Sequence, residues 1–588
     1  MIKIFKYLKS KDWGLIGASL VFIVAQVWLD LKMPDYMSEI TKLVQTPGSA
    51  MADIWGAGGM MLLCALGSLA ASITVGYFAA KVAANLSATL RGNLFNKVQS
   101  FSMKEINQFS TASLITRSTN DITQVQTIVA MGLQMMIKAP ITAVWAIVKI
   151  SGKSWQWTTA TAVAVGILLV LIMMLVLVVL PKNKRIQAMT DNLNEVTREN
   201  LTGLRVVRAY NAEDYQQKKF DEANGELTST NLFVTRMMAL MMPAMTLINS
   251  GLSLAIYWIG TYLIDAAQMM DKISLFSDMI VFISYAMQIL MSFMMLTIIF
   301  IMLPRAMVSA IRINEVLDTE LSITDGAGIK EPTKEKGTVE FKNVSFMYPG
   351  ATGHILRNIN FTAQQGEVVA FIGSTGSGKS TLINLVPRFY DVTDGQVLVD
   401  GVDVREYKQE ELNNKLGYVS QKAVLFSGTV ASNVAYGETV YGEPGEEDIR
   451  QAVQIAQAAE FVDKMDKGIE SSISQGGTNV SGGQKQRLSI ARAVCRKPEI
   501  YIFDDSFSAL DYKTDRVLRT ALKKETGDVT SLIVAQRVGT IMDADKIIVL
   551  DKGEVVGMGK HKDLLRTCDV YREIAESQLS KEELADAQ

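Results

Sequence analysis

One short segment of the sequence combines the residue types that bind phosphate. It consists of Gly373, Ser374, Thr375, Gly376, Ser377, Gly378, Lys379 and Ser380, followed by Thr381. The apolar run EVVAFI precedes it and the helical run TLINLV follows it, so the order is strand, G-x-x-x-x-G-K-S loop, helix. Glycines let several backbone N–H groups turn toward an anion, and the helix N-terminus adds its positive end. The Lys379 ammonium then reaches the terminal phosphates, and the Ser380 hydroxyl is placed for Mg²⁺.

Two further segments carry groups suited to phosphate or metal chemistry. Asp504 directly follows the apolar run 500–503, and a carboxylate at a strand end can hold Mg²⁺ directly or through water. The segment Ser481–Gln484 (SGGQ) precedes the helical run KQRLSIARAV and presents N–H donors to an anion. Because the chain already has one complete phosphate loop upstream, this second set indicates a contact to the γ-phosphate of a nucleotide held elsewhere.

These segments belong to the second half of the chain, where β-rich runs alternate with amphipathic helical stretches. The β-rich runs are VEFKNVSFMY, EVVAFIG, QVLVDGVDV, LGYVSQ, EIYIFDD, SLIVAQR and KIIVLDKGEVVGMG. This alternation predicts an α/β domain over 338–588, with parallel core strands and an antiparallel portion. Polar residues with Pro and Gly predict a linker at 321–337.

The first half contains six apolar stretches that can each cross a bilayer as a helix. We expect spans at about 13–33, 54–80, 122–150, 156–180, 237–264 and 279–304. They form an α-helical membrane domain over 1–320 whose helices extend into the cytoplasm; buried core helices are the less favoured alternative. Lys and Arg concentrate between spans two and three and between spans four and five. This bias predicts that those loops and both termini are cytoplasmic.

Composition and charge exclude several classes of protein. The 58 Lys and Arg residues are balanced by 60 Asp and Glu residues, so no basic surface for nucleic acid is predicted. With 49% hydrophobic residues, the chain is neither disordered nor a disulfide scaffold. The cysteines Cys64, Cys495 and Cys568 are scattered and form neither a metal-binding pattern nor a disulfide framework.

Some polar residues within the predicted spans could line a substrate cavity. They are Gln134, Asn249, Tyr257 and Gln288. Lys138 lies beside Pro140 in the third span, and an ionisable residue at membrane depth is a candidate functional site. We favour the alternative, a lysine that snorkels from near the cytoplasmic end or lines an aqueous vestibule.

The motifs together resemble those of the ATP-binding cassette (ABC) transporters, and six spans before one nucleotide-binding domain resemble the exporter order. The markers are Tyr348 in FMYPG, the loop Gly373–Ser380, Gln421 in YVSQ, the signature Ser481, Gly482, Gly483 and Gln484, Asp504, and SALD at Ser508–Asp511. The resemblance covers the whole chain. It implies that the chain binds ATP with Mg²⁺, with Tyr348 stacked on adenine and with Ser380, Gln421 and Asp504 around the metal.

The resemblance also implies how two such chains cooperate. In this family two nucleotide-binding domains enclose two ATP molecules, each between the phosphate loop of one domain and the signature of the other. The loops Phe109–Asp121 and Asn200–Asp214 resemble the coupling segments that dock on these domains.

Two positions depart from the family pattern. The catalytic base of the family is a glutamate directly after the strand-end aspartate, and here that position is Asp505. Aspartate is one methylene shorter, roughly 1.5 Å of reach, and the positioning of an attacking water is sensitive at that scale. The switch histidine of the family corresponds to Gln536, which can hydrogen-bond to phosphate but cannot become cationic.

The chain therefore resembles the degenerate half of a bacterial heterodimeric multidrug exporter, a weak ATPase when alone. Its expected partners are a second ABC exporter half with the catalytic glutamate and switch histidine, membrane lipid and a small amphiphilic substrate. We expect a multi-pass protein of the cell membrane with a cytoplasmic nucleotide-binding domain. A lipid or peptide exporter half and a nucleotide-sensing regulatory subunit are alternatives; the complete six-span half and the coupling loops favour transport.

Overall fold

The computed structural model describes residues 1–46, 48–329, 335–437, 439, 441–525 and 527–579. The chain divides into two compact units, which we describe separately. The helical unit comprises Met1–Gln99 and Ser110–Thr319, and the α/β unit comprises Ser100–Phe109 and the chain from Glu320 onward. Part of the predicted linker, 330–334, lies outside the described residues.

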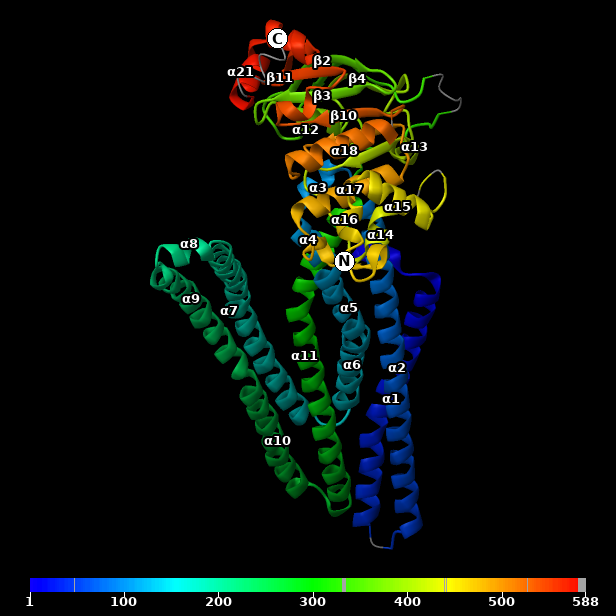
Figure 1. Cartoon of the computed structure of the whole chain (residues 1–588). Helices are drawn as coiled ribbons and strands as arrows, with labels where there is room; N and C mark the ends of the chain where they lie inside the picture. Colours follow the sequence, from blue (N-terminus) through cyan, green and yellow to red (C-terminus); the bar gives the residue numbers. More distant parts are fainter. Residues whose placement is uncertain (47, 330–334, 438, 440, 526, 580–588) are drawn as a thin grey trace. The chain divides into compact units, whose positions relative to one another are not determined.

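The helical unit consists of long helices joined by shorter ones (Figure 1). They are α1 (Ser10–Gln45), α2 (Met51–Gln99), α4 (Thr111–Thr116), α5 (Ile122–Met131), α6 (Ile137–Ser151), α7 (Trp155–Thr202), α8 (Leu204–Ala209), α9 (Glu213–Ala239), α10 (Met241–Ala266) and α11 (Met269–Asp318). π-Helical turns at Arg117–Asp121 and Gly132–Met136 join α4, α5 and α6 into one rod. Among the described residues, six helical stretches are long and apolar enough to cross a membrane, which confirms the predicted number.

These helices extend well beyond the predicted apolar spans. Helix α1 continues through Pro34 to Gln45, whereas the predicted span ended before this proline. Helix α7 has 48 residues, about 72 Å at about 1.5 Å per residue, more than twice the roughly 30 Å core of a bilayer. Hydropathy marks only the apolar part, because the backbone hydrogen bonds of a helix continue through polar sequence. A 3-10 helix at Ile2–Tyr7 precedes α1.

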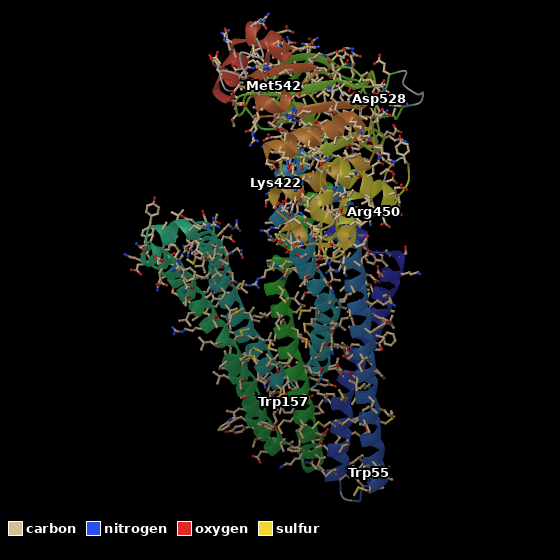
Figure 2. The ribbon with its side chains drawn as sticks, in the orientation of Figure 1. Trp55, Trp157, Lys422, Arg450, Asp528 and Met542 are labelled. Carbon is tan, nitrogen blue, oxygen red and sulfur yellow. The ribbon has the colours of Figure 1, made fainter. Side chains whose placement is uncertain are left out.

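Trp157 joins three of the long helices. Its side chain is buried, and its Nε1 donates a hydrogen bond to the Ile256 carbonyl at 3.2 Å (Figure 2). Its ring packs against Phe282 with 5.5 Å between centroids. The indole therefore buries a large apolar area while its N–H keeps a partner, and it connects α7, α10 and α11.

The α/β unit contains short helices and three sheets. Its helices are α3 (Met103–Gln108), α12 (Lys379–Asn384), α13 (Gln409–Asn414), α14 (Val430–Val434), α15 (Glu446–Ile455), α16 (Ala459–Val462), α17 (Gly482–Cys495), α18 (Tyr512–Glu525), α19 (Val538–Ile541), α20 (His561–Thr567) and α21 (Asp569–Gln578). Its strands are β1 (Val339–Phe346), β2 (Leu356–Ala363), β3 (Val368–Gly373), β4 (Asp394–Val399), β5 (Val402–Asp403), β6 (Leu416–Val419), β7 (Gly428–Thr429), β8 (Ser472–Ile473), β9 (Ile500–Asp504), β10 (Thr530–Val534), β11 (Lys546–Asp551) and β12 (Glu554–Gly559).

The strands confirm the predicted mixture of parallel and antiparallel pairing. The main sheet has the order β12-β11-β3-β10-β9-β6, and its strands from β11 to β6 are parallel. An antiparallel sheet has the order β2-β1-β4-β5, and β7 pairs with β8. Strand β2 (LRNINFTA) was absent from the predicted strands because its exposed Arg and Asn residues interrupt the apolar pattern.

The register of the main sheet places several functional residues at one edge. Val534 of β10 is level with Phe371 of β3 and with Asp504 of β9. The carboxyl ends of parallel strands meet at the same edge of a sheet, which is where ligands bind in open α/β sheets. The end of β3 at Gly373 and the end of β9 at Asp504 therefore face the same space.

An ion cluster connects the antiparallel sheet to the main sheet. Lys415, just before β6, contacts Asp400, just after β4, at 2.7 Å and Glu499, just before β9, at 2.9 Å. The Asp400 side chain is fully buried and also accepts a hydrogen bond from the Thr338 N–H at 3.1 Å. The two carboxylates raise the pKa of Lys415 although burial alone would lower it. The cluster thus fixes three strand ends from two sheets.

Replacing Lys415 by Met should strongly destabilise the α/β unit. Asp400 would remain buried without its cation, a change that costs about 3–5 kcal/mol in comparable buried pairs. Thermal unfolding of the purified chain should show a lower midpoint for Lys415→Met. The control is Lys497→Met, because the Lys497–Asp448 pair is exposed and such pairs contribute about 1 kcal/mol or less. Equal midpoints for the two variants would contradict the role of the cluster.

Candidate functional site

The phosphate loop follows β3 and bends tightly before α12. Gly373 has φ +154°, and a Cβ there would lie 2.0 Å from the Leu550 carbonyl oxygen. Gly378 has φ +97°, and a Cβ there would lie 2.7 Å from the Leu356 side chain. Both positions therefore need glycine for backbone conformation and for space. The resulting loop suits an anion held by backbone N–H groups.

Lys379 begins α12 and folds back over this loop. Its ammonium donates hydrogen bonds to the carbonyls of Gly373 at 2.9 Å and Ser374 at 2.8 Å. Burial lowers the pKa of Lys379, while the carboxylates of Asp505 and Asp504 oppose this shift. A phosphate group would offer this desolvated cation a stronger, charged partner than the two carbonyls.

Ser380 and Asp504 meet at the edge of the sheet. The Ser380 hydroxyl donates to Asp504 Oδ1 at 2.8 Å, and Asp504 is 5% exposed. Burial raises the pKa of Asp504, and the Ser380 hydrogen bond opposes this effect. A hydroxyl beside a carboxylate supplies the hard oxygen ligands that Mg²⁺ prefers, so these two residues fit the expected metal.

Asp505 contacts the two glutamines at the predicted metal and switch positions, Gln421 and Gln536. Its Oδ2 accepts a hydrogen bond from Gln536 Nε2 at 2.7 Å and another from Gln421 Nε2 at 3.2 Å. Its backbone has φ +47°, and its N–H donates to the Val534 carbonyl at 3.0 Å. The carboxylate is 7% exposed. Asp505 is thus fixed by the strand end and by two amide donors.

Tyr348 lies against the helix of the phosphate loop. Its hydroxyl hydrogen-bonds with Thr381 of α12 at 3.0 Å. Its ring packs edge-on against Tyr390 and Phe346, with centroids 5.2 Å and 4.9 Å apart. Tyr348, the residue expected to stack on adenine, therefore belongs to an aromatic cluster that is hydrogen-bonded to the helix after the phosphate loop.

Helix α3 is a part of this site region that the sequence reasoning missed. Its residue Asn107 donates to the Tyr390 hydroxyl at 3.0 Å, and α3 belongs to the α/β unit. The predicted coupling segment began only at Phe109. The capping box of Ser102 and Glu105, an S-x-x-E pattern, was the available signal for a helix start.

The segment Ser481–Gln484 starts α17 at the protein surface. The Ser481 hydroxyl accepts from the Gln484 N–H at 3.3 Å, and Gln484 Oε1 accepts from the Ser481 N–H at 2.9 Å. Ser481 and Gly482 are exposed, and Gly483 is half-buried. Within the described chain these side-chain contacts are local to the segment. Its exposure suits contact with a ligand that another chain holds.

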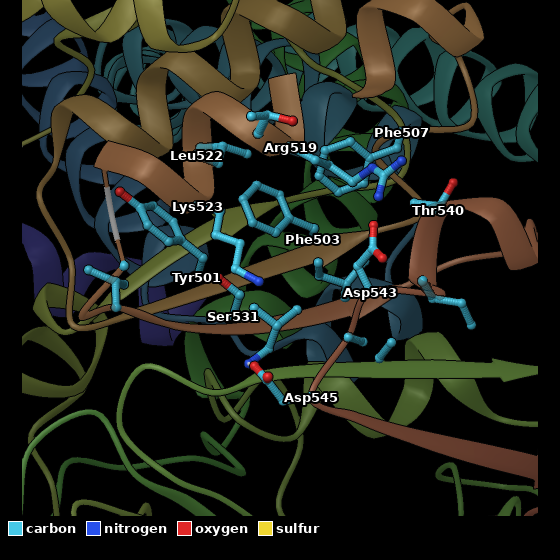
Figure 3. A pocket seen from close by; sticks show the side chains of 18 of the residues that line it. Tyr501, Phe503, Phe507, Arg519, Leu522, Lys523, Ser531, Thr540, Asp543 and Asp545 are labelled. Carbon is cyan, nitrogen blue, oxygen red and sulfur yellow. The ribbon is translucent and has the colours of Figure 1, made fainter. Parts of the chain in front are cut away.

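A cavity of about 700 Å³ lies on the other face of the main sheet (Figure 3). Its walls include Tyr501, Phe503 and Phe507 together with Arg519 and Asp543. Val368 and Ala370 of β3 point toward it, whereas α12 packs on the opposite face of the sheet. No residue of the phosphate loop lines this cavity, so it is separate from the site.

In the helical unit, Lys138 has a partner that the sequence did not indicate. Its ammonium lies 3.0 Å from Asp30 Oδ2. Of the four predicted cavity residues, Gln134 lies against Gly76 of α2 and Tyr257 is exposed. Asn249 lies on α10, the helix that also carries Tyr257. Among the described residues, the Oε1 atom of Gln288 is buried without a hydrogen-bond partner. The four residues come from several helices and do not by themselves define a cavity.

Comparisons with known proteins agree with both units. The pattern of the ABC transporter family matches residues 356–508, and that of the ABC transporter transmembrane region matches residues 16–293. An uncharacterized ABC transporter ATP-binding protein of Mycobacterium tuberculosis is 41% identical over 524 residues, 89% of this chain and 88% of that protein. The Bacillus subtilis protein YfiB, with the same description, is 34% identical over 97% of each chain.

Two further relatives bear on activity and fold. An ATP-dependent lipid A-core flippase of Pseudomonas aeruginosa is 32% identical over 489 residues, 83% of this chain and 79% of that protein. The structure of a bacterial Atm1-family ABC exporter with ATP bound superimposes with a TM-score of 0.80 at 22% identity, covering 96% of this chain and 98% of that chain. With its helical unit, its phosphate loop and these relatives, the chain belongs to the ABC transporter family and is an exporter-type, multi-pass membrane protein whose transport is coupled to ATP.

Proposed function

We propose that this chain is one subunit of a heterodimeric exporter that moves amphiphilic molecules, including drugs, out across the cytoplasmic membrane. Its own ATP site is degenerate, and its signature completes the hydrolytic site of a partner subunit. That partner carries the catalytic glutamate and the switch histidine. The distribution of Lys and Arg supports a cytoplasmic location for the α/β unit and both termini.

The arrangement of Asp505 carries this proposal. A general base must have a free oxygen within hydrogen-bond reach of the water that it activates. In Asp505, the hydrogen bonds from Gln536 and Gln421 to Oδ2 fix the carboxylate, and the side chain is one methylene shorter than glutamate, so its other oxygen reaches less far toward a water. Gln536 offers an amide that has no ionisable proton, so it cannot supply positive charge to a phosphate.

The groups that bind nucleotide are complete. Lys379 and the loop N–H groups would hold the phosphates, and Ser380 and Asp504 would hold Mg²⁺. When bound, Mg²⁺ neutralises charge on the phosphates and on Asp504, whose pKa burial raises. Tyr348 would orient the adenine. This chain therefore has the residues for binding ATP and lacks those for activating water.

Two other functions have specific support. The lipid A-core flippases among the relatives favour a lipid as the amphiphile. A nucleotide-sensing regulatory subunit would also retain binding groups without a catalytic base. The six membrane-crossing helices and α3 favour transport, because a sensor does not need a complete translocation unit.

The isolated chain should hydrolyse ATP slowly, and restoring two residues should raise its turnover. A positioned acid–base group contributes about 10²–10⁴-fold. We expect Asp505→Glu with Gln536→His to increase ATP turnover of the purified chain by about tenfold or more. The same double variant carrying Lys379→Ala controls for contaminating ATPases. If the unmodified chain hydrolysed ATP rapidly, this result would contradict the proposal that its own ATP site is degenerate.

The degenerate site should still bind ATP with Mg²⁺. Removing the Lys379 ammonium deletes charged hydrogen bonds worth about 1.5–3 kcal/mol, or about 10–100-fold in affinity. Filter binding of labelled ATP to the purified chain should show this loss in Lys379→Ala. Tyr348→Ala should also bind more weakly, whereas Tyr348→Phe keeps the ring and should bind nearly normally. Absence of ATP binding by the unmodified chain would refute this prediction.

Damage to the signature should harm the assembled complex more than damage to Asp505. Ser481 and the N–H groups of Gly482 and Gly483 would contact the γ-phosphate in the competent site, and losing one such donor costs about 10²–10³-fold in rate. Ser481→Ala combined with a bulky replacement of Gly483 should nearly abolish ATP turnover. Asp505→Asn lies in the other site and should cost far less.

This comparison requires both variants at equal expression and with equal association with the partner subunit. Size-exclusion chromatography of the complex checks association before turnover is measured. If Asp505→Asn is the more damaging variant, this chain supplies the competent site instead of the degenerate one.

A further inference from the structure

Three polar side chains meet at a junction of α1, α2 and α6 in the helical unit. Lys138 of α6 lies 3.0 Å from Asp30 of α1, and the Ser68 hydroxyl of α2 donates to the other carboxylate oxygen of Asp30. We call Asp30, Ser68 and Lys138 the polar junction. Gln134 lies nearby in the chain, one π-helical turn before Lys138, and its amide rests against Gly76 of α2.

The polar junction lies deep within the membrane-crossing stretches. Asp30 is about 22 Å from the end of α1 at Gln45, and Lys138 is about 20 Å from the end of α6 at Ser151, at about 1.5 Å per residue. Both helical stretches are apolar enough to span a bilayer, whose core is about 30 Å thick. The two charges therefore lie at matching distances from these helix ends, within the spans predicted at 13–33 and 122–150.

The helices are irregular beside both charges. Pro34 lies one turn after Asp30 and removes the N–H that would bond the Asp30 carbonyl in a regular helix. A π-helical turn at Gly132–Met136 directly precedes α6, and Pro140 follows Lys138. π-Helical turns inside α-helices are frequent at functional sites.

The helical unit does not need the ion pair between Lys138 and Asp30 for its stability. Charges inside a membrane are costly, and well-packed apolar residues often replace a buried pair without loss of stability. A second ion pair, between Lys149 and Asp35, is 33% and 31% exposed, but Lys149 lies in the last turn of α6, where a charge is less costly. Lys138 and Asp30 are 25% and 21% exposed and lie farther from these helix ends.

We propose that the polar junction is the headgroup site for zwitterionic amphiphiles, molecules with an ammonium and a phosphate on one apolar tail. The ammonium pairs with Asp30 and the phosphate pairs with Lys138, so one internal ion pair is exchanged for two external pairs. Every protein charge keeps a partner during this exchange. An amphiphile with a single charge leaves either Asp30 or Lys138 unpaired within the apolar layer, which is costly. Ser68 supplies a hydroxyl for the remaining headgroup oxygens.

This assignment rests on the proposed export of amphiphiles and names their class. The test uses the full chain in lipid nanodiscs without ATP, so its result is independent of the ATPase predictions. Three probes with the same dodecyl tail compete with a fluorescent-tailed phosphocholine: dodecylphosphocholine, dodecyltrimethylammonium and dodecyl phosphate. The unmodified chain should bind dodecylphosphocholine about tenfold more tightly than either singly charged probe.

Neutralising one charge should shift this preference in a direction that depends on which charge is lost. Asp30→Asn leaves Lys138 and should favour dodecyl phosphate, whereas Lys138→Gln leaves Asp30 and should favour dodecyltrimethylammonium. Matched controls are Asp278→Asn and Lys153→Gln, because that ion pair has similar exposure, 27% and 25%, but lies where α6 ends. The controls should keep the preference of the unmodified chain.

The exchanged variant Asp30→Lys with Lys138→Asp keeps an ion pair if the single variants fail to fold. It should retain the preference for dodecylphosphocholine, since a zwitterion can bind in the reverse orientation. Equal loss of affinity for all three probes in both single variants would show that the pair is only structural. Absence of a preference in the unmodified chain, or in a folded exchanged variant, would overturn the headgroup site.

Discussion

The parallel register of β3, β10 and β9 is the constraint on which the nucleotide site depends. It sets the ends of these strands level, so the phosphate loop after Gly373 and the carboxylate of Asp504 face one space. Ser380 can then reach Asp504 across β10, and the backbone N–H of Asp505 bonds to the Val534 carbonyl at the end of β10. A shift of one residue in β9 would disrupt both contacts, and a shift in β3 would move Ser380 away from Asp504.

Local sequence was enough to predict the parts of this site that are contiguous. The loop Gly373–Ser380 depends on glycine conformations and spacing, which a sequence displays directly. The hydrogen bonds of Asp505 to Gln421 and Gln536 connect residues 84 and 31 positions apart. Sequence could place these residues near one nucleotide only through a resemblance, because no local pattern encodes which amide contacts which carboxylate oxygen.

The helical unit shows the same limit in another form. Hydropathy predicted six spans because each apolar stretch is continuous, but it could not show where the helices end or that α3 packs with the α/β unit. Helix ends depend on capping and tertiary contacts. The partner of Lys138 could not be predicted, because Asp30 is on another helix and an ion pair leaves no trace in hydropathy.

Both units keep costly polar groups in places where apolar residues would also pack. In the α/β unit the Lys415 cluster fixes strand ends, and each of its charges is fully paired within the chain. Asp505 and the polar junction are also paired within the chain. The difference lies in position: Asp505 directly follows the strand end that carries Asp504, and Lys138 and Asp30 lie within predicted membrane spans, where charged residues mark functional sites. Lys149 lies in the last turn of α6, and Lys415 lies beside strand ends of the α/β unit, so a structural role accounts for both.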